Sequence, residues 1–194
     1  MAHVDESGVR CPDGTRLVGL VAVLTRSRSH PDLAGPLRDL LLSSRDSLHY
    51  YDETPARRVQ IADVIARLPI SGALIITKIT TDQLQERAPA RLFTALLPRL
   101  QHVEHIGRVI IESRGGSDKL DRRVRDRLRR SRSITADLHI DHARKREDER
   151  LWLPDFIAGS YIGALSGAGP EPWKIVSESH IIEVISLDCG PHEL

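Results

Sequence analysis

His3-Val4-Asp5-Glu6-Ser7-Gly8 stands almost at the start of the chain, and the interpretation of the fold begins from this stretch. A short apolar step, two carboxylates and a Ser-Gly pair are typical of a strand that ends in a turn. We therefore predict a first strand that carries Asp5 at its carboxyl end. The same residues are equally typical of an ordinary solvated turn. Asp5 becomes a stronger candidate for a functional site because two later apolar elements each carry one conspicuous acid, Glu112 and Asp155.

The overall composition has no dominant charge. The chain has 194 residues, of which 40% are hydrophobic, and this predicts a single domain over residues 1–194 with a sizeable core. Since 28 Lys and Arg face 27 Asp and Glu, the net charge is +1, and any surface for nucleic acid must be local.

Cysteine use and hydropathy bear on location. Cys11 and Cys189 lack metal-ligand spacing and fit free thiols in a reducing cytosol, although one disulfide stays open as an alternative. No apolar run approaches the roughly 20 residues of a membrane span. We expect a soluble, cytoplasmic protein that does not enter a membrane, and the oligomeric state, a homo-oligomer included, stays open.

The first third of the chain predicts an antiparallel hairpin and two helices. Cys-Pro-Asp-Gly at 11–14 is a turn sequence, and the continuously apolar run 17–24 predicts a buried strand paired with the first. Helices are predicted to begin near Pro31 and at Pro55, where proline suits the first helical turn. The segment 46–54 is left open between a short strand and an ordered loop.

The rest of the chain alternates between strand and helix patterns. The predicted elements are a strand at 73–79, a helix at 82–100, a strand at 109–112, a helix at 118–130, a strand at 136–140, a helix at 151–165 and a final strand or hairpin within 175–187. An antiparallel start followed by βαβαβ predicts an α/β fold with a mixed sheet and helices on its faces.

Glu112 and Asp155 are candidate site residues because of where they stand. Glu112 ends an apolar strand, the edge at which open α/β sheets bind ligands, although a strand-terminal Glu that meets solvent is the competing interpretation. Asp155 is the one group in a long apolar helix that ionises near pH 7, and a buried carboxylate needs a cation or hydrogen-bond donors. An Asp in a first helical turn is also favoured by the helix dipole alone.

Carboxylates from separate elements suit hard divalent cations. Mg²⁺ and Mn²⁺ prefer oxygen ligands and keep open positions for phosphate. The associated chemistry is phosphodiester hydrolysis, in which metal ions activate water and stabilise the leaving oxygen.

Three motifs resemble a large bacterial family of unknown function that opens on Asp-Glu-Ser-Gly. They are residues 5–8, Glu112-Ser113-Arg114 after an Ile-rich strand, and Leu151-Trp-Leu-Pro-Asp-Phe-Ile-Ala-Gly159, and the resemblance spans residues 3 to about 165. It implies a ribonuclease H-like fold, a metal-binding set of Asp5, Glu112 and Asp155, and Glu6 and Ser7 close by.

The resemblance also implies features that the sequence pattern lacks. A ribonuclease H-like nuclease usually has a three-stranded antiparallel meander and a further acid from its first helix. Only two antiparallel strands are predicted here. His49, Asp52 and Glu53 are the candidates for the further site residue.

One predicted helix is locally basic. Arg122, Arg125 and Arg129 lie on the helix at 118–130, and Arg114 precedes it. Guanidinium groups bind phosphates bidentately, so these four residues are the candidate contacts to nucleic acid. A solubilising outer face is the competing interpretation. His139, Asp141 and His142 have no recognised metal-ligand spacing and are interpreted as surface residues.

The sequence therefore predicts a divalent-metal-dependent nuclease, with DNA or RNA undecided as its substrate. The alternative is a catalytically inactive ribonuclease H-like protein that binds nucleic acid or regulates a partner.

Overall fold

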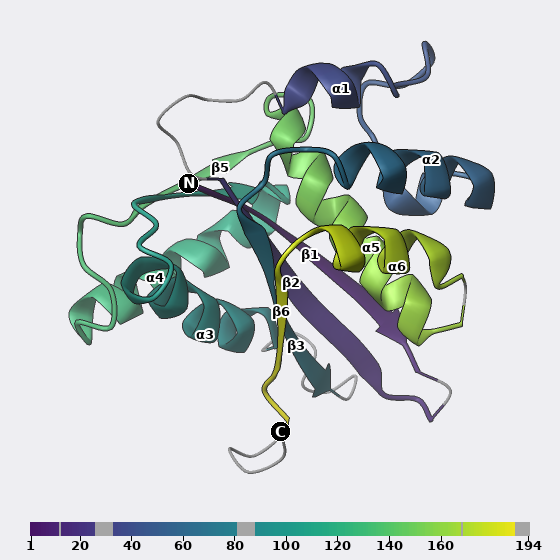
Figure 1. The fold of residues 1–194 in the computed structure, drawn as a ribbon. Coiled ribbons are helices and arrows are strands. Elements are labelled where there is room, and N and C mark those ends of the chain that lie inside the picture. The colour runs from purple at the N-terminus through teal and green to yellow at the C-terminus, as the bar shows by residue number, and fades with distance from the viewer. Residues whose placement is uncertain (12, 26–32, 81–87, 168, 189–194) are drawn as a thin grey trace.

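The fold is a six-stranded mixed sheet with helices on both faces (Figure 1). The computed structural model describes residues 1–11, 13–25, 33–80, 88–167 and 169–188. The strands are β1 (Ala2–Arg10), β2 (Arg16–Leu24), β3 (Gly72–Thr80), β4 (Arg108–Glu112), β5 (His139–Ala143) and β6 (Ile182–Ser186). Their order in the sheet is β5-β4-β1-β2-β3-β6.

The predicted hairpin of the first two strands is confirmed. β1 and β2 pair antiparallel over their whole length, from Ala2 with Leu24 to Arg10 with Arg16. Gly14 adopts a φ of +83° in the connecting turn, and its N–H donates to the carbonyl of Cys11 at 3.0 Å. The predicted Ser-Gly turn after Asp5 is wrong, because β1 continues through Gly8 to Arg10 and Asp5 lies within the strand.

The missing third strand of the meander is β3. Its apolar sequence predicted a strand, but one that opened the alternating half of the chain. β3 instead pairs antiparallel with β2 along all nine residues, and β6 then pairs parallel with β3. Two helices intervene between β2 and β3 in sequence, so the pairing is not visible in the local pattern.

Two hydrophobic clusters lie between the sheet and its helices, one on each face of the sheet. The helices are α1 (Ala34–Arg38), α2 (Pro55–Ile65), α3 (Ala88–His102), α4 (Asp118–Arg130), α5 (Trp152–Leu165) and α6 (Glu171–Ser179). α3 and α4 cover one face of the sheet and share a core with Val4, Leu20 and Ile76. α1, α2, α5 and α6 cover the other face and share a core with Val21 and Ile75. Successive strand residues thus face opposite layers.

Several predicted boundaries differ from the observed ones. The helix expected near Pro31 is described only from Ala34 to Arg38, and the undecided segment 46–54 contains a 3₁₀ turn at Tyr50–Asp52. The strand expected at 136–140 is β5, three residues later. The region expected to be a final strand or hairpin begins with α6, so that only β6 is a strand. Cys11 is a free thiol, and Cys189 lies outside the described residues.

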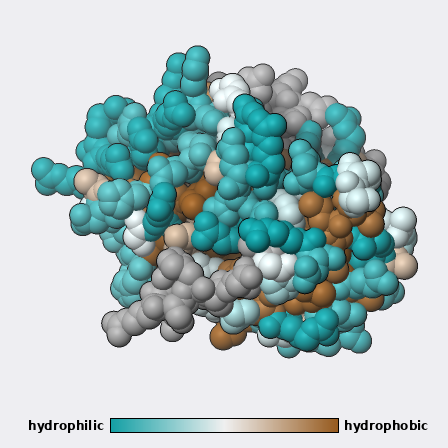
Figure 2. Space-filling view, turned by 90° about the horizontal axis from the view of Figure 1, so that it is seen from above, coloured by the Kyte–Doolittle hydropathy of each residue, from teal (hydrophilic) through white to brown (hydrophobic). Residues whose placement is uncertain are grey.

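The surface agrees with the balanced composition. Hydrophilic residues cover most of the face seen from above, and hydrophobic residues show between them (Figure 2). Among the described helices, none combines the length and the hydrophobicity that crossing a bilayer requires.

Candidate acidic centre and arginine helix

Asp5 and Glu112 lie where two parallel strands part. β4 pairs with β1 as far as Ile111 with Val4, and Glu112 and Asp5 are the next residue on each strand. Val4 and Ile111 belong to the core under α3 and α4, so the alternation of side chains turns Asp5 and Glu112 toward the layer of α5. Asp5 is only 3% exposed.

Asp155 reaches the same place from the first turn of α5. This helix packs along β1 and β2, and its glycine at 159 meets the ring of Tyr50 so closely that no Cβ would fit. The backbone N–H of Tyr50 donates to Oδ2 of Asp155 at 2.9 Å. The close packing of Gly159 against Tyr50 therefore helps fix the position of the Asp155 carboxylate.

The three carboxylates converge on one cation, the ammonium group of Lys145. The distances from Nζ are 2.7 Å to Oδ1 of Asp155, 3.0 Å to Oδ2 of Asp5 and 3.3 Å to Oε2 of Glu112. The Lys145 side chain is 7% exposed, and the indole N–H of Trp152 donates to the Lys145 carbonyl at 3.0 Å. The structure thus brings the three predicted acids together around a positive charge that the sequence analysis missed.

Burial and nearby charges shift the pKa values of the residues in this centre in different directions. Burial raises the pKa of Asp5 well above its usual range, and a hydrogen bond shared with Glu112 raises it further, although Lys145 opposes the shift. Burial also raises the pKa of Asp155, but the contacts with His49 and Lys145 outweigh burial and lower it. Burial lowers the pKa of Lys145, and the carboxylates outweigh this effect and raise it above its usual range. One carboxyl thus tends to keep its proton while Asp155 and Lys145 form an ion pair.

Of the additional candidates, only His49 borders the centre. Its Nδ1 lies 3.8 Å from Oδ1 of Asp155 and 3.3 Å from Nζ of Lys145. Glu53 is buried but binds Arg57 at 2.8 Å.

Asp52 and Ser7 also lie apart from the ammonium group of Lys145. The side chain of Asp52 is 58% exposed, and Ser7 pairs with Gly19 in the β1–β2 ladder. Neither has a described contact with Lys145.

Glu6 lies on the opposite face of the sheet from Asp5. Its carboxylate forms a short ion pair with Nη1 of Arg114, and Nη2 of Arg114 lies 3.6 Å from Oδ1 of Asp121. Burial lowers the pKa of Arg114, but Glu6 and Asp121 outweigh burial and raise it. Arg114 therefore connects the β1 strand to α4, and its charge is shared between two carboxylates.

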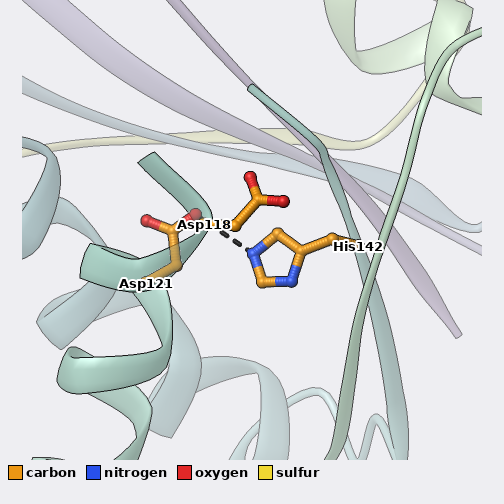
Figure 3. Close-up of side chains that lie close together, drawn as sticks. All are labelled: Asp118, Asp121 and His142. Carbon is orange, nitrogen blue, oxygen red and sulfur yellow. Dashed lines mark hydrogen bonds and ion pairs between the residues drawn. The ribbon is translucent and has the colours of Figure 1, made fainter. Parts of the chain in front are cut away.

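Asp118, Asp121 and His142 form a second titratable cluster, on the α4 side of the sheet (Figure 3). Their ligand atoms all lie within 4.8 Å of one another, which is close enough to hold a metal ion. Nε2 of His142 lies 3.2 Å from Asp121, so the interpretation of His142 as a surface residue is wrong. Asp118 already accepts hydrogen bonds from Ser113 at 2.8 Å and from the N–H of Arg114 at 3.0 Å. The sequence hid this cluster because β5 and α4 meet only in the tertiary structure.

The arginines of α4 separate into two faces. Arg122, Arg125 and Arg129 share one face, on which Arg125 pairs with Asp126 at 2.8 Å and Arg129 donates to the Leu138 carbonyl at 3.0 Å. The other face carries the arginines at 123, 127 and 130, which line a cavity with Arg114. Of the four predicted nucleic-acid contacts, Arg114 alone lines that cavity. Leu120 is 50% exposed and lines the same cavity.

Lys145 is the residue that sequence reasoning had least chance of finding. It stands in the charged segment 141–150, where Arg144 and Arg146 are equally basic, and nothing in the sequence pattern separates it from them. The turn after β5 buries Lys145 and leaves Arg144 and Arg146 exposed, and only the tertiary structure shows this.

Comparison with known proteins assigns no function to this site. No family model matches the sequence, and no curated protein matches it. Among solved structures, a chain of the PCNA:RNase HII complex from Archaeoglobus fulgidus aligns with 100% of this chain and 96% of its own length. The sequence identity is 14% and the TM-score is 0.46, too low for this likeness to establish a shared fold or activity.

Proposed function

We propose that this chain is a ribonuclease H-like nucleic-acid phosphodiesterase whose acidic centre consists of Asp5, Glu112 and Asp155. The observation that carries the proposal is the convergence of three carboxylates, supplied by β1, β4 and α5, on a single cationic atom within 3.3 Å.

The strand arrangement supports the ribonuclease H-like assignment. β1, β2 and β3 form an antiparallel meander, and β4 and β5 add parallel strands beside β1. This is the arrangement that the motif resemblance implies, with β6 as an additional edge strand. In this fold the acidic centre lies at the carboxyl end of β4, next to the middle of β1.

The residues of the centre fit a divalent cation. Three largely buried carboxylates are the oxygen ligands that Mg²⁺ and Mn²⁺ prefer, and the position of the Lys145 ammonium marks the point at which they attract positive charge. A bound divalent ion would lower the pKa of water at the centre and neutralise charge on the phosphate. Asp5, Glu112 and Asp155 would hold the ion, and His49 at the rim would orient Asp155.

Lys145 also supports a second candidate function. Its ammonium already neutralises the carboxylates, and it competes with a metal ion for the same oxygens. A protein that kept this arrangement would be a catalytically inactive binder of nucleic acid, stabilised by the ion pairs. The two candidates differ in whether a divalent ion displaces the ammonium.

Calorimetric titration with Mn²⁺ and Mg²⁺, paired with a cleavage assay on single-stranded and duplex DNA and RNA, tests the proposal. We expect the wild type to bind metal and cleave, and the variant Asp5→Asn with Asp155→Asn to lose both. The matched control is Asp52→Asn, because it removes an exposed carboxylate near the centre but outside it.

Three other outcomes would decide otherwise. Nucleic-acid binding without metal binding or cleavage would favour the inactive binder. Cleavage that persists in the double variant would overturn the acidic centre. Metal binding that persists in the double variant but disappears in His142→Gln would place the metal at Asp118, Asp121 and His142 (Figure 3).

A further inference from the structure

The strongest feature outside the acidic centre is the cavity between α3 and α4, which lie side by side on one face of the sheet (Figure 1). Its volume is about 430 Å³, within the range of small-ligand sites, which is about 300 to 1,000 Å³. The first turn of α3 forms one wall and α4 forms the other. The acidic centre does not use this cavity, because Asp5 and Glu112 face the opposite side of the sheet.

The charge of the cavity favours an anionic ligand. Four guanidinium groups and one carboxylate line it, namely those of Arg114, Arg123, Arg127, Arg130 and Asp121. Arg114 is engaged with Glu6 and Asp121, and Arg127 donates to Thr94 at 2.9 Å. Within the part of the chain that the structure describes, the guanidinium groups of Arg123 and Arg130 have no hydrogen bond or ion pair. Two uncommitted guanidinium groups on a concave wall can bind phosphate oxygens bidentately.

The rest of the lining favours a ligand that also has an apolar face. Leu120 is 50% exposed and Val124 is 6% exposed, and both face the cavity with the first turn of α3. Free phosphate would gain no contact energy from apolar side chains, whereas an unstacked nucleobase can pack against them. Bases outside a duplex stack on arginine guanidinium planes and pack between aromatic or apolar side chains.

The cavity reaches β1 from the face of the sheet opposite the acidic centre. Arg114 lines the cavity and forms the ion pair with Glu6, the residue next to Asp5 in β1. A nucleic-acid strand bound by the cavity arginines would therefore lie near the β1 segment that carries Asp5, on the opposite face of the sheet.

We propose that the cavity binds an unpaired nucleotide unit of single-stranded nucleic acid, with its phosphate on Arg123, Arg127 and Arg130 and its base on the wall of Leu120 and Val124. This inference deepens the proposed function and rests on it for the identity of the polymer. It assigns the substrate's single-stranded flank to the α3–α4 side. A duplex cannot use the site, because its bases are stacked inside the helix.

Adjacent arginines of α4 provide a matched test. Arg122 and Arg123 are both exposed, and neither side chain forms a hydrogen bond or ion pair with a described residue, but only Arg123 lines the cavity. Fluorescence anisotropy in EDTA measures binding of labelled 12-residue single strands of DNA and RNA, of the corresponding duplexes and of polyglutamate. Thermal unfolding of each variant verifies that it is folded.

We expect Arg123→Ala and Arg130→Ala each to weaken single-strand binding about tenfold, the effect of losing one charge-assisted hydrogen-bond pair. The slope of log K against log salt should fall by about 0.7 for each arginine removed. Arg122→Ala should change affinity by less than about twofold, as a surface substitution does. Leu120→Ser should weaken binding of single strands but leave binding of inorganic polyphosphate unchanged.

Several outcomes would overturn the assignment. Equal losses in Arg122→Ala and Arg123→Ala would show a diffuse basic surface. Duplex or polyglutamate binding as tight as single-strand binding would exclude a nucleotide cavity, and so would an unchanged affinity in Leu120→Ser. Because binding is measured in EDTA, the two proposals fail separately: intact binding without cleavage counts against the nuclease, and cleavage unaffected by Arg123→Ala counts against the cavity.

Discussion

Replacement of Lys145 by methionine separates the structural role of the ammonium from that of a metal ion. Methionine keeps an apolar stem of similar length and removes the charge. The wild-type side chain is 7% exposed and lies within 3.3 Å of three carboxylates. Removal of one partner of a buried ion pair costs about 3 to 5 kcal/mol, because the remaining charges are left uncompensated.

The lower end of that range applies here. Asp5 takes up a proton readily, since its pKa is already raised, and this relieves part of the repulsion. We therefore expect Lys145→Met in EDTA to lose about 3 kcal/mol of unfolding free energy. For a chain of this size, such a loss lowers Tm by roughly 6 to 12 °C.

Divalent metal should reverse the loss. With the ammonium gone, the carboxylates no longer have a competing cation, so Mn²⁺ should bind the variant more tightly than the wild type. At about 100 times the Kd, a ligand of the folded state adds about 2.7 kcal/mol to stability. The expected result is a Tm increase on Mn²⁺ addition that is larger in Lys145→Met than in the wild type.

Thermal unfolding followed by circular dichroism, in EDTA and in Mn²⁺, makes the measurement. Lys119→Met is the matched control, because Lys119 is exposed on α4 and the same substitution there should change stability by less than about 0.5 kcal/mol. A wild-type Tm for Lys145→Met in EDTA would refute the buried ion cluster. A Mn²⁺ effect no larger in the variant than in the wild type would refute competition between lysine and metal.

Three further predictions concern packing and pH. Gly159→Ala should destabilise the fold by about 1 to 3 kcal/mol in urea unfolding, because its Cβ would overlap the ring of Tyr50, whereas Gly107→Ala has open space and should be neutral. Burial raises the pKa of Asp148, but His3 and Arg150 outweigh burial and hold the folded-state pKa below its usual value. Its contribution to the free energy of unfolding is therefore present above about pH 4 and is lost as the pH falls further. In Asp148→Asn, the unfolding free energy measured in urea should depend less on pH between about pH 4 and pH 2, and an unchanged slope would contradict this. Asp5 has a raised pKa, so its ionisation opposes folding as the pH rises; Asp5→Asn in EDTA should be at least as stable as wild type at pH 8, and a marked loss there would show that ionised Asp5 is needed.

The accuracy of the sequence-based prediction follows the range of the interactions. The β1–β2 hairpin was predictable because a Cys-Pro-Asp-Gly turn joins two neighbouring strands, and α2 was predictable because Thr54 and Pro55 form a local helix start. The same local pattern identified β3 as a strand but could not give its partner. Its pairing with β2 depends on the path of the chain through α1 and α2.

Site prediction divides in the same way. Asp5, Glu112 and Asp155 stood out because an acid is unusual on an apolar element, and the structure places all three against one atom. Arg122, Arg125 and Arg129 stood out as part of a basic run, but helical geometry turns them away from the cavity that their neighbours line. Composition identifies a basic helix and not which of its faces is in use.

By itself, the sequence determined the elements and the acids that they carry. Hydrophobic periodicity, turn residues and proline positions act over a few residues, and these interactions define most strands and helices before any tertiary contact exists. Only the tertiary structure decided that Lys145 neutralises the acids, that His142 joins Asp118 and Asp121, and that β3 completes the meander. Each of these depends on contacts between residues far apart in the chain, and a linear pattern does not contain the distances between such residues.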